Sequence, residues 1–234
     1  MANIVITGAS NGIGFETALA LAKQGNNVLA IARTRSGLAN LQSATVSETH
    51  AEKIQVLPFD IVSGDYRQTL IPLVKEKFGQ IHALINNAGA LLNKPFTETS
   101  AADFLTMTQS NLVGHVQIIQ HLLPHLAANS HIVNIGSMGG FQGSVKFPGL
   151  AAYSASKAAL HALTECLALE FTDRNIKINC LALGSAQTEM LEKAFPGYKS
   201  PVTALEMGTY IAHFALTGHQ FFNGKILPVA VTTP

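Results

Sequence analysis

The sequence predicts an α/β fold in which helices cover both faces of a seven-stranded parallel sheet. Seven short runs of apolar and β-branched residues recur along the chain. They are near-continuous and not alternating, as expected of strands that are covered on both faces. Segments with helical spacing separate these runs, so strand and helix alternate, which is typical of a right-handed, doubly wound sheet. Such sheets bind ligands beyond the carboxyl ends of their strands.

The expected strands are, in order, residues 3–7, 27–32, 54–59, 82–86, 131–137, 176–183 and 225–231. Helical spacing is clearest in "GFETALALAKQG", in "DFLTMTQSNLVGHVQIIQHLLPHL" and in "YSASKAALHALTECLALE". In the last of these, five residues are expected to share the inner faces: Ala158, Leu160, Ala162, Leu163 and Leu167. The chain has no internal repeat and no linker, so residues 1–234 are expected to form one domain.

The composition argues against several classes of partner. Hydrophobic residues make up 47% of the chain, charged residues 12%, and the formal net charge is +1, which leaves no basic excess for nucleic acid or a membrane surface. No apolar run approaches the roughly 18 residues that span a bilayer, and "MANIVITGAS" is typical of a strand and not of a signal peptide. Cys166 and Cys180 suit small buried residues in a reducing compartment. We therefore expect a cytoplasmic protein with a small-molecule partner.

The histidines do not indicate a metal site. His115, His121 and His125 fall on one expected helix, but no carboxylate or cysteine stands at ligand spacing from them. Without a third ligand a catalytic zinc site is not expected.

The first expected strand runs directly into "TGASNGIG", a glycine-rich turn that leads into a helix beginning near Phe15. Glycines at such a turn let the chain bend tightly and bring backbone N–H groups up to a pyrophosphate at the helix N-terminus. The spacing is GxxxGxG, and a tight turn without a ligand is the alternative interpretation. The candidate cofactor-binding residues of this turn are Gly8, Ser10, Asn11, Gly12, Ile13 and Gly14.

The end of the second expected strand favours NADP over NAD. In NAD-binding folds a carboxylate about 20 residues beyond the glycines binds the ribose hydroxyls, and here Ala32 stands at that position. Arg33 and Arg35 follow, and a guanidinium can hold a 2′-phosphate in a bidentate manner. Alternatively, both arginines are solvated ends of a loop. After the third strand, Asp60, with Ile61 beside it, is a candidate acceptor for the adenine amino group or a turn former.

Tyr153 and Lys157 lie four residues apart at the start of an expected helix, so their side chains share one face. A tyrosine has a pKa of about 10, and a nearby positive charge favours its phenolate. The pair can therefore give a proton to a carbonyl oxygen as a hydride arrives, or remove one from an alcohol. Ser137 ends the preceding strand, where its hydroxyl can donate to the same oxygen. Taken singly, the pair can be a chance feature of a surface helix, and the serine a cap or turn residue.

Six stretches occur in an order that resembles the short-chain dehydrogenase/reductase family, in its single-domain branch. They are "TGASNGIG", "NNAG" at 86–89, "SNLVG" around Asn111, "NIGS" ending at Ser137, "YSASK", and "INCLALGSAQT" at 178–188. The resemblance covers nearly the whole chain. It implies a Rossmann-type fold with a nicotinamide cofactor.

The resemblance also implies roles for individual residues. Tyr153 would be the general acid/base, Lys157 would lower its pKa and hold the nicotinamide ribose, and Ser137 would polarise the substrate carbonyl. Asn111 would bend its helix and hold a water in a proton relay to Lys157; from the residues alone, a buried structural amide explains Asn111 nearly as well. The other residues assigned to the cofactor are Asn87, Ala88 and Gly89 on the adenosine side, and Gly184, Ala186 and Thr188 on the nicotinamide side.

The leading hypothesis is an NADPH-dependent oxidoreductase that transfers a hydride between the nicotinamide and a carbonyl or alcohol substrate. The alternative is a non-catalytic NADP(H)-binding regulatory protein of the same fold, although such proteins typically lose the tyrosine or the lysine. A methyltransferase is disfavoured, because it would need an acidic residue at Ala32. A homodimer or homotetramer is expected from the resemblance and from outward apolar positions on the helices at 101–126 and 153–174.

Three features depart from the family pattern. Leu183 replaces the usual proline before Gly184, which leaves the loop over the nicotinamide less fixed. The segment between Ser137 and Tyr153 is longer than usual and should form part of the wall of the substrate pocket, and the C-terminal stretch lacks the usual Asp-Gly-Gly. None of these features identifies the substrate. The segment after Thr188, "EMLEKAFPGYKS", can form either an amphipathic lid or ordinary packing.

Overall fold

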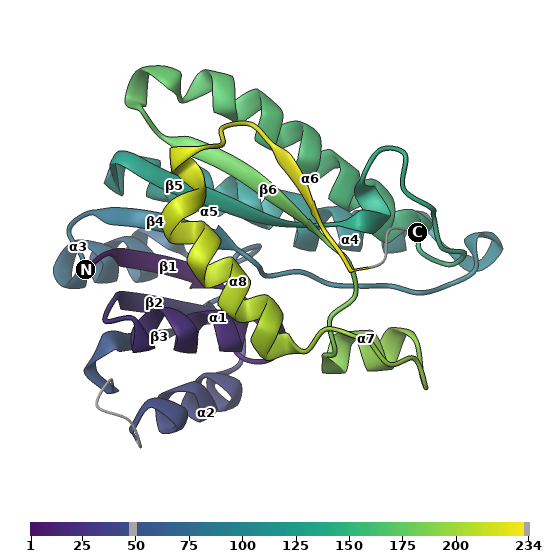
Figure 1. The fold of residues 1–234 in the computed structure, drawn as a ribbon, viewed down its shortest axis with the longest axis horizontal. Coiled ribbons are helices and arrows are strands. Elements are labelled where there is room, and N and C mark those ends of the chain that lie inside the picture. Colours follow the sequence, from purple (N-terminus) through teal and green to yellow (C-terminus); the bar gives the residue numbers. More distant parts are fainter. Residues whose placement is uncertain (47–50, 232–234) are drawn as a thin grey trace.

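The computed structural model describes residues 1–46 and 51–231 and confirms the predicted fold. Seven parallel strands form one sheet in the order β3-β2-β1-β4-β5-β6-β7 (Figure 1). They are β1 (Asn3–Thr7), β2 (Asn27–Ala32), β3 (Ile54–Pro58), β4 (Ile81–Asn86), β5 (Leu126–Ser137), β6 (Lys177–Leu183) and β7 (Ile226–Val229). The strand order reverses between β1 and β4. The loops that follow these two strands therefore diverge and leave a crevice at their carboxyl ends.

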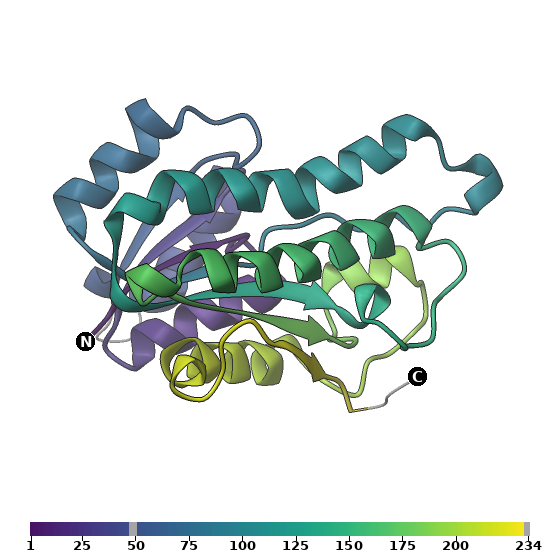
Figure 2. The same cartoon turned by 90° about the horizontal axis from the view of Figure 1, so that it is seen from above.

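Helices cover both faces of the sheet (Figure 2). The α-helices of the described residues are α1 (Gly12–Lys23), α2 (Arg35–Val46), α3 (Ile71–Lys77), α4 (Ala101–Thr108), α5 (Gly114–Leu122), α6 (Ala151–Glu170), α7 (Glu189–Ala194) and α8 (Ala204–Thr217). In Figure 2, α3, α4, α5 and α6 lie on one side of the sheet, and α1 and α8 lie on the other. The helix α7 lies beyond the strand ends, away from both layers (Figure 1).

Each face of the sheet has its own hydrophobic core, because successive strand residues point to opposite faces. Ile4 of β1 is fully buried in one core, together with Leu21 of α1 and Ile211 of α8. Val5, the next residue along β1, is buried in the other core with Ile118 of α5. Each such buried side chain contributes about 2 kcal/mol. The two cores hold the strand ends in place, and the site is built on those ends.

Some element boundaries differ from the sequence prediction. The helix α1 begins at Gly12, ahead of Phe15, so part of the glycine turn already belongs to the first helical turn. The strand β5 begins at Leu126 and not at His131. The sequence prediction missed this start because the polar residues Asn129 and Ser130 hide the strand pattern. Its pairing with β4 is irregular there, where the register shifts.

The residues that α6 buries are more polar than predicted. Of the five residues expected there, only Leu160 is fully buried, while Ala158 and Ala162 are exposed. The helix instead buries a polar set: Ser156, Lys157, His161 and Thr164. Alanine suits either face of a helix, so the apolar spacing was a poor guide here. Cys166 also proves exposed, against the prediction, whereas Cys180 in β6 is buried as expected.

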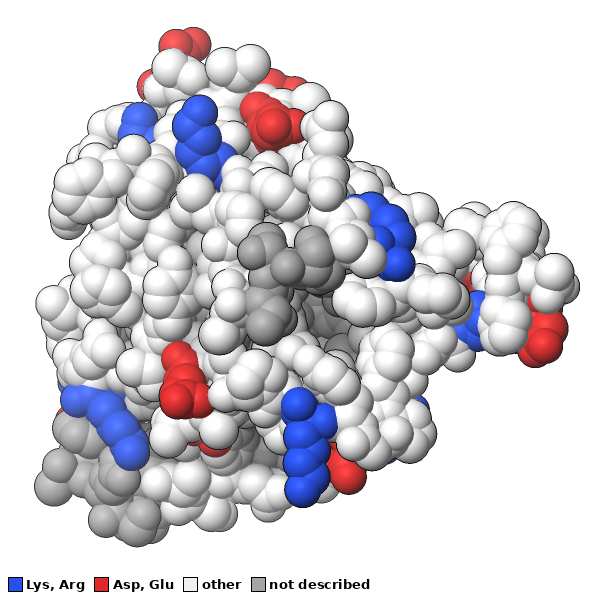
Figure 3. Space-filling view, turned by 45° about the vertical axis from the view of Figure 1, so that its right-hand side comes forward, with Lys and Arg blue, Asp and Glu red and all other residues white. Residues whose placement is uncertain are grey.

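The face shown in Figure 3 gives little sign of a highly charged partner. No helix among the described residues is long and apolar enough to cross a membrane. On the face shown in Figure 3, the Lys and Arg side chains are set apart from one another by uncharged surface, with Asp and Glu scattered among them. This face therefore has no basic patch of the kind that binds nucleic acid.

Candidate active site

A cleft of about 450 Å³ opens at the carboxyl ends of the strands. It brings together Gly8, Ser10, Asn11, Gly12, Ile13, Gly14, Arg33, Asp60, Ile61, Asn87, Ala88, Gly89, Ser137, Tyr153, Lys157, Gly184, Ala186 and Thr188. All of these are candidates from the sequence. Two further candidates, Arg35 and Asn111, are not among the described residues that line it.

The glycine turn leaves space where side chains would otherwise stand. Gly8 and Gly12 have φ values of 69° and 56°, in the left-handed region that favours glycine. A Cβ on Gly14 would lie 2.3 Å from the carbonyl oxygen of Gly8, which no other residue tolerates. Asn11 stands at the N-cap of α1 but makes no side-chain cap hydrogen bond. The first N–H groups of α1 are therefore left to bind an anion such as a pyrophosphate.

Asn87 ties the turn after β4 to the glycine turn after β1. Its Nδ2 donates to the carbonyl oxygens of Thr7, at 3.0 Å, and Gly8, at 3.1 Å. The Oγ1 of Thr7 accepts in return from the backbone N–H groups of Asn87 and Ala88. These bonds fix the two loops that flank the crevice relative to each other, and they give Asn87 a clear structural role beside its expected place at the cofactor.

The two arginines proposed for the 2′-phosphate are placed differently. Arg33 is exposed and lines the cleft, with Thr34 beside it, a residue that the sequence did not single out. Arg35 is the first residue of α2 and is not among the described residues that line the cleft, so its place at the 2′-phosphate stays a prediction. Asp60 lines the cleft and also forms a turn, since its Oδ1 accepts from the N–H of Val62 at 2.8 Å.

Ser137 and Tyr153 meet where β5 ends and α6 begins. The Oγ of Ser137 accepts from the N–H of Gly139 at 3.1 Å, and the Ser137 side chain is close enough to the Tyr153 hydroxyl to affect its pKa. Burial raises the pKa of the Tyr153 hydroxyl, and the Ser137 side chain lowers it in part. The sheet sets the position of Ser137 and the first turn of α6 sets that of Tyr153, so neither depends on a long loop.

Lys157 lies one turn along α6 from Tyr153. Its Nζ is 6.0 Å from the centroid of the Tyr153 ring and donates to the carbonyl oxygen of Ile135 at 2.7 Å. Burial lowers the pKa of Lys157 to about 8, while Cys180 opposes this. In this structure burial is the largest influence on the pKa of Tyr153 and raises it, so the lowering expected from Lys157 stays a prediction.

Asn111 lies in a π-helical turn (Gln109–Val113) that separates α4 from α5, so the expected break is present. Its Oδ1 accepts from the N–H of Ala90 at 2.8 Å, and its Nδ2 donates to the carbonyl oxygen of Ala90 at 2.9 Å. The Nδ2 also donates to the Oγ of Ser156 at 3.0 Å. These contacts favour the buried structural amide. The water relay to Lys157 stays a prediction.

Two buried histidines close to Lys157 were not assigned to the site from the sequence, and neither is among the described residues that line the cleft. His115 donates from Nε2 to the carbonyl oxygen of Ala88 at 2.6 Å. Burial, together with the charge of Lys157, lowers the pKa of His115 to about 3 and that of His161 to about 4. Both rings are therefore neutral at pH 7. His161 follows Lys157 by four residues, a spacing that places both on one helix face; His115 has no comparable signal.

The segment after Thr188 covers one side of the cleft as α7. Thr188 caps this helix, because its Oγ1 accepts from the N–H of Leu191 at 3.2 Å. Met190 and Leu191 line the cleft. Of the two interpretations of this segment, the geometry favours the lid.

Comparison with known proteins agrees with this arrangement. The family described as short chain dehydrogenase matches residues 2–199. An uncharacterised oxidoreductase of Staphylococcus saprophyticus is 33% identical over 188 residues, which are 80% of this chain and 79% of that protein. The 3-oxoacyl-(acyl-carrier-protein) reductase FabG of Thermotoga maritima is 31% identical over 191 residues, which are 81% of this chain and 76% of that protein. The chain belongs to the short-chain dehydrogenase/reductase family.

Solved structures show the same fold. A short-chain dehydrogenase/reductase from Brucella melitensis has a TM-score of 0.86 and 27% identity, with 98% of this chain and 95% of that chain covered. A structure of ElxO with NADP bound has a TM-score of 0.83 and 28% identity, with 98% of each chain covered. Family and fold together make this protein an oxidoreductase.

Proposed function

We propose that this protein is an NADPH-dependent reductase that converts a carbonyl group of a small molecule to an alcohol, and catalyses the reverse reaction. The convergence of Ser137, Tyr153 and Lys157 carries this proposal. These three side chains line the same cleft as the glycine turn. A dinucleotide bound by its pyrophosphate at that turn therefore has its reactive end within reach of a proton donor.

The residues of the cleft fit NADPH. The glycine turn leaves room for a pyrophosphate that any side chain on Gly14 would take away. Arg33 lines the cleft after β2, and Ala32 stands where NAD-binding folds carry the acidic residue that would repel a 2′-phosphate. The likeness to ElxO, which has been solved with NADP bound, supports the same choice. When bound, NADPH supplies the hydride.

The chain's own residues orient the carbonyl group and supply the proton. The Ser137 hydroxyl, positioned through its bond from Gly139, donates to the carbonyl oxygen. As the hydride adds to the carbonyl carbon, the oxygen takes the proton of the Tyr153 hydroxyl, which yields an alcohol and a tyrosinate. Lys157 stabilises that tyrosinate by its charge until a proton from solvent restores it. The alcohol is oxidised by the same steps in reverse.

We also propose that residues 1–234 form a single catalytic domain. The glycine turn and the three reacting groups stand on strands and helices of one sheet, which supports this. Apolar side chains exposed on α4 and α6 support a homodimer or homotetramer.

The test is a fluorescence titration with NADPH and NADH, followed by a panel of ketones and aldehydes monitored at the nicotinamide absorbance. For a carbonyl compound that is reduced, Tyr153→Phe should lower kcat by at least about 100-fold, because the proton donor is lost. NADPH affinity should stay within about twofold, since the ring remains in place. The control is Tyr210→Phe in α8, which should leave both unchanged. Binding without turnover across the panel would instead favour the non-catalytic regulatory protein.

A further inference from the structure

We infer that Asn93 is a positioning residue for the substrate end of the cleft, where it holds the lid α7 in place. The residue stands on the segment that follows β4 and runs out beyond the sheet (Figure 1). It joins this segment to the loop at 141–149 and to α7, which are distant in the sequence. The kinetic part of the inference rests on the proposed reductase activity; the structural part does not.

The first contact is with the C-terminal end of α7. The Nδ2 of Asn93 donates to the carbonyl oxygen of Ala194, the last residue of that helix, at 2.7 Å. The last carbonyl groups of a helix have no partner within it, so this bond satisfies one of them. A helix as short as Glu189–Ala194 is marginal without tertiary contacts. Thr188 caps its N-terminal end, and Asn93 holds the other.

A second contact fixes the backbone next to Asn93. The N–H of Lys94 donates to the carbonyl oxygen of Gly149 at 2.9 Å. Gly149 has a φ of 86°, and a Cβ there would lie 2.1 Å from the Oδ1 of Asn93. The side chain of Asn93 thus occupies the space that a residue larger than glycine would take. Lys94 also forms an ion pair with Asp103 of α4 at 3.0 Å, which joins the segment to that helix.

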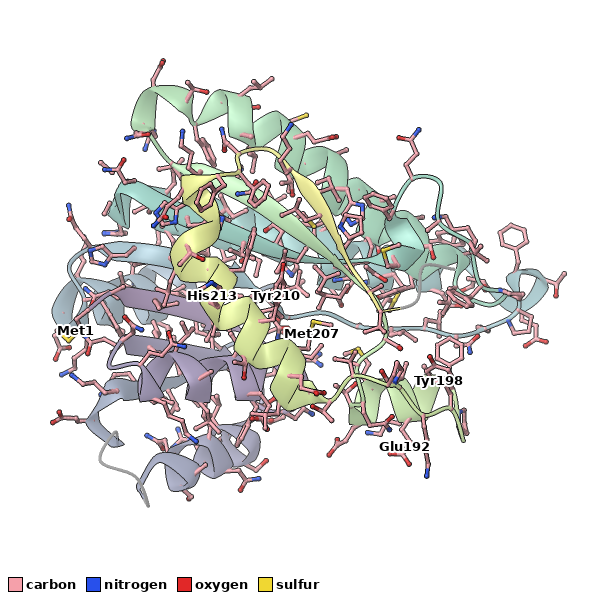
Figure 4. The ribbon with its side chains drawn as sticks, viewed as in Figure 1. Met1, Glu192, Tyr198, Met207, Tyr210 and His213 are labelled. Atoms are coloured by element: carbon pink, nitrogen blue, oxygen red, sulfur yellow. The ribbon has the colours of Figure 1, made fainter. Side chains whose placement is uncertain are left out.

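A separate contact holds the segment that follows α7. The hydroxyl of Tyr198 lies 3.2 Å from the Oγ of Ser185, and the Oγ of Ser200 donates to the carbonyl oxygen of Ser185 at 2.9 Å. Figure 4 shows Glu192 on α7 and Tyr198 on the segment after it. These bonds are local to one loop. Asn93, by contrast, bonds α7 to a part of the chain that is distant in the sequence.

The position of α7 shapes the cleft without touching the reacting groups. Met190 and Leu191 of α7 line it, as does Leu91, which precedes Asn93 by two residues. A looser α7 therefore moves apolar walls, while the three reacting groups of β5 and α6 stay in place. We expect the loss of the Asn93 bond to raise the KM for a carbonyl substrate and to leave kcat nearly unchanged.

The structural test is hydrogen exchange of the α7 amides in Asn93→Asp. This variant keeps the shape of the side chain but replaces the donor by an acceptor. Exchange from Leu191 to Phe195 should become about three- to tenfold faster, which is the range that a net hydrogen bond represents. The control is Asn40→Asp, the same change at an exposed residue of α2, where α7 should exchange as in the wild type. Unchanged exchange of α7 in Asn93→Asp would overturn the inference.

A second variant tests whether Gly149 acts through Asn93. Gly149→Ala should loosen α7 in the wild-type background, both by backbone strain and by pushing Asn93 aside. In an Asn93→Ala background no side chain remains to be displaced, so the added effect on exchange should be smaller. Equal effects of Gly149→Ala in the two backgrounds would overturn the linkage between the two residues.

The kinetic readout separates this inference from the proposed function. With a carbonyl compound that the wild type reduces, Asn93→Asp should raise KM by about three- to tenfold and keep kcat within about twofold. An equal loss in kcat would contradict a positioning role at the lid. If the wild type reduces no carbonyl compound, the proposed function fails, and the exchange experiment still decides whether Asn93 holds α7.

Discussion

Lys157 places a positive charge in the interior, where only 4% of its surface is exposed. Burial lowers its pKa to about 8 from an ordinary 10.5. Between these two values the unfolded chain binds more protons at this residue than the folded chain does. The contribution of Lys157 to the free energy of unfolding therefore rises with pH through this window, and below about pH 8 its full cost is present.

Lys157→Met should remove this cost. The variant should be more stable than the wild type at pH 7 by about 1–3 kcal/mol, after allowance for the lost bond to Ile135. The advantage should shrink as the pH rises from about 8 towards 10.5. Urea unfolding of both proteins over this range measures it. Burial also raises the pKa of Cys180, to about 12, and Lys157 opposes this, so the loss of Lys157 raises it further and folded Cys180 keeps its proton over this range in both proteins. A difference that does not vary with pH would contradict this account of Lys157.

Arg33 should determine the preference of the protein for NADPH over NADH. Arg33→Ala should weaken NADPH binding by about 10- to 100-fold and NADH binding by much less, because only NADPH carries the 2′-phosphate. Arg35→Ala is the matched control, since Arg35 lies outside the cleft lining, and it should change neither affinity appreciably. Titration of the three proteins with both cofactors measures this. Equal losses for NADPH and NADH in Arg33→Ala would place the 2′-phosphate elsewhere.

At the scale of elements, the turn between β1 and α1 is the part of the cleft with the least room for change. Gly14→Ala should abolish measurable NADPH binding, because its Cβ would meet the Gly8 carbonyl oxygen and, at 2.4 Å, the Nδ2 of Asn87. Gly25→Ala is the comparison. Gly25 has a φ of 82° but no atom within 4 Å of its would-be Cβ, so this change should cost about 1 kcal/mol of stability and leave binding intact. Denaturation and NADPH titration distinguish the two effects.

The elements themselves were largely predictable from the sequence. Strands buried on both faces leave continuous apolar runs such as that of β2, and the glycines of the first turn have no alternative that fits their backbone. The start of β5 and the inner face of α6 were not predictable, because pairing with β4 and packing over the site override local pattern there. The role of Asn93 could not be predicted from the sequence for a related reason. Its partner, Ala194, follows by about 100 residues and uses only a backbone atom.

At the scale of the whole molecule, large apolar side chains are exposed on the helices of both sides of the sheet. Leu105 of α4 is 63% exposed and Leu169 of α6 is 79% exposed, on two helices that lie side by side in Figure 2. Val113, in the turn between α4 and α5, is 37% exposed on the same layer. Exposed apolar side chains on a helical layer favour association, and a second copy of the chain is the partner proposed here.

Sedimentation should therefore show a species of twice or four times 24.8 kDa. Leu169→Glu should shift the protein towards 24.8 kDa, because a carboxylate in the interface would lose its water without gaining a partner. Its NADPH affinity should not change, since Leu169 lies at the end of α6 remote from Tyr153. Leu205→Glu in α8, on the other side of the sheet and 59% exposed, is the control and should leave at least the dimer intact. A wild-type protein that sediments only at 24.8 kDa would show that this apolar layer faces solvent.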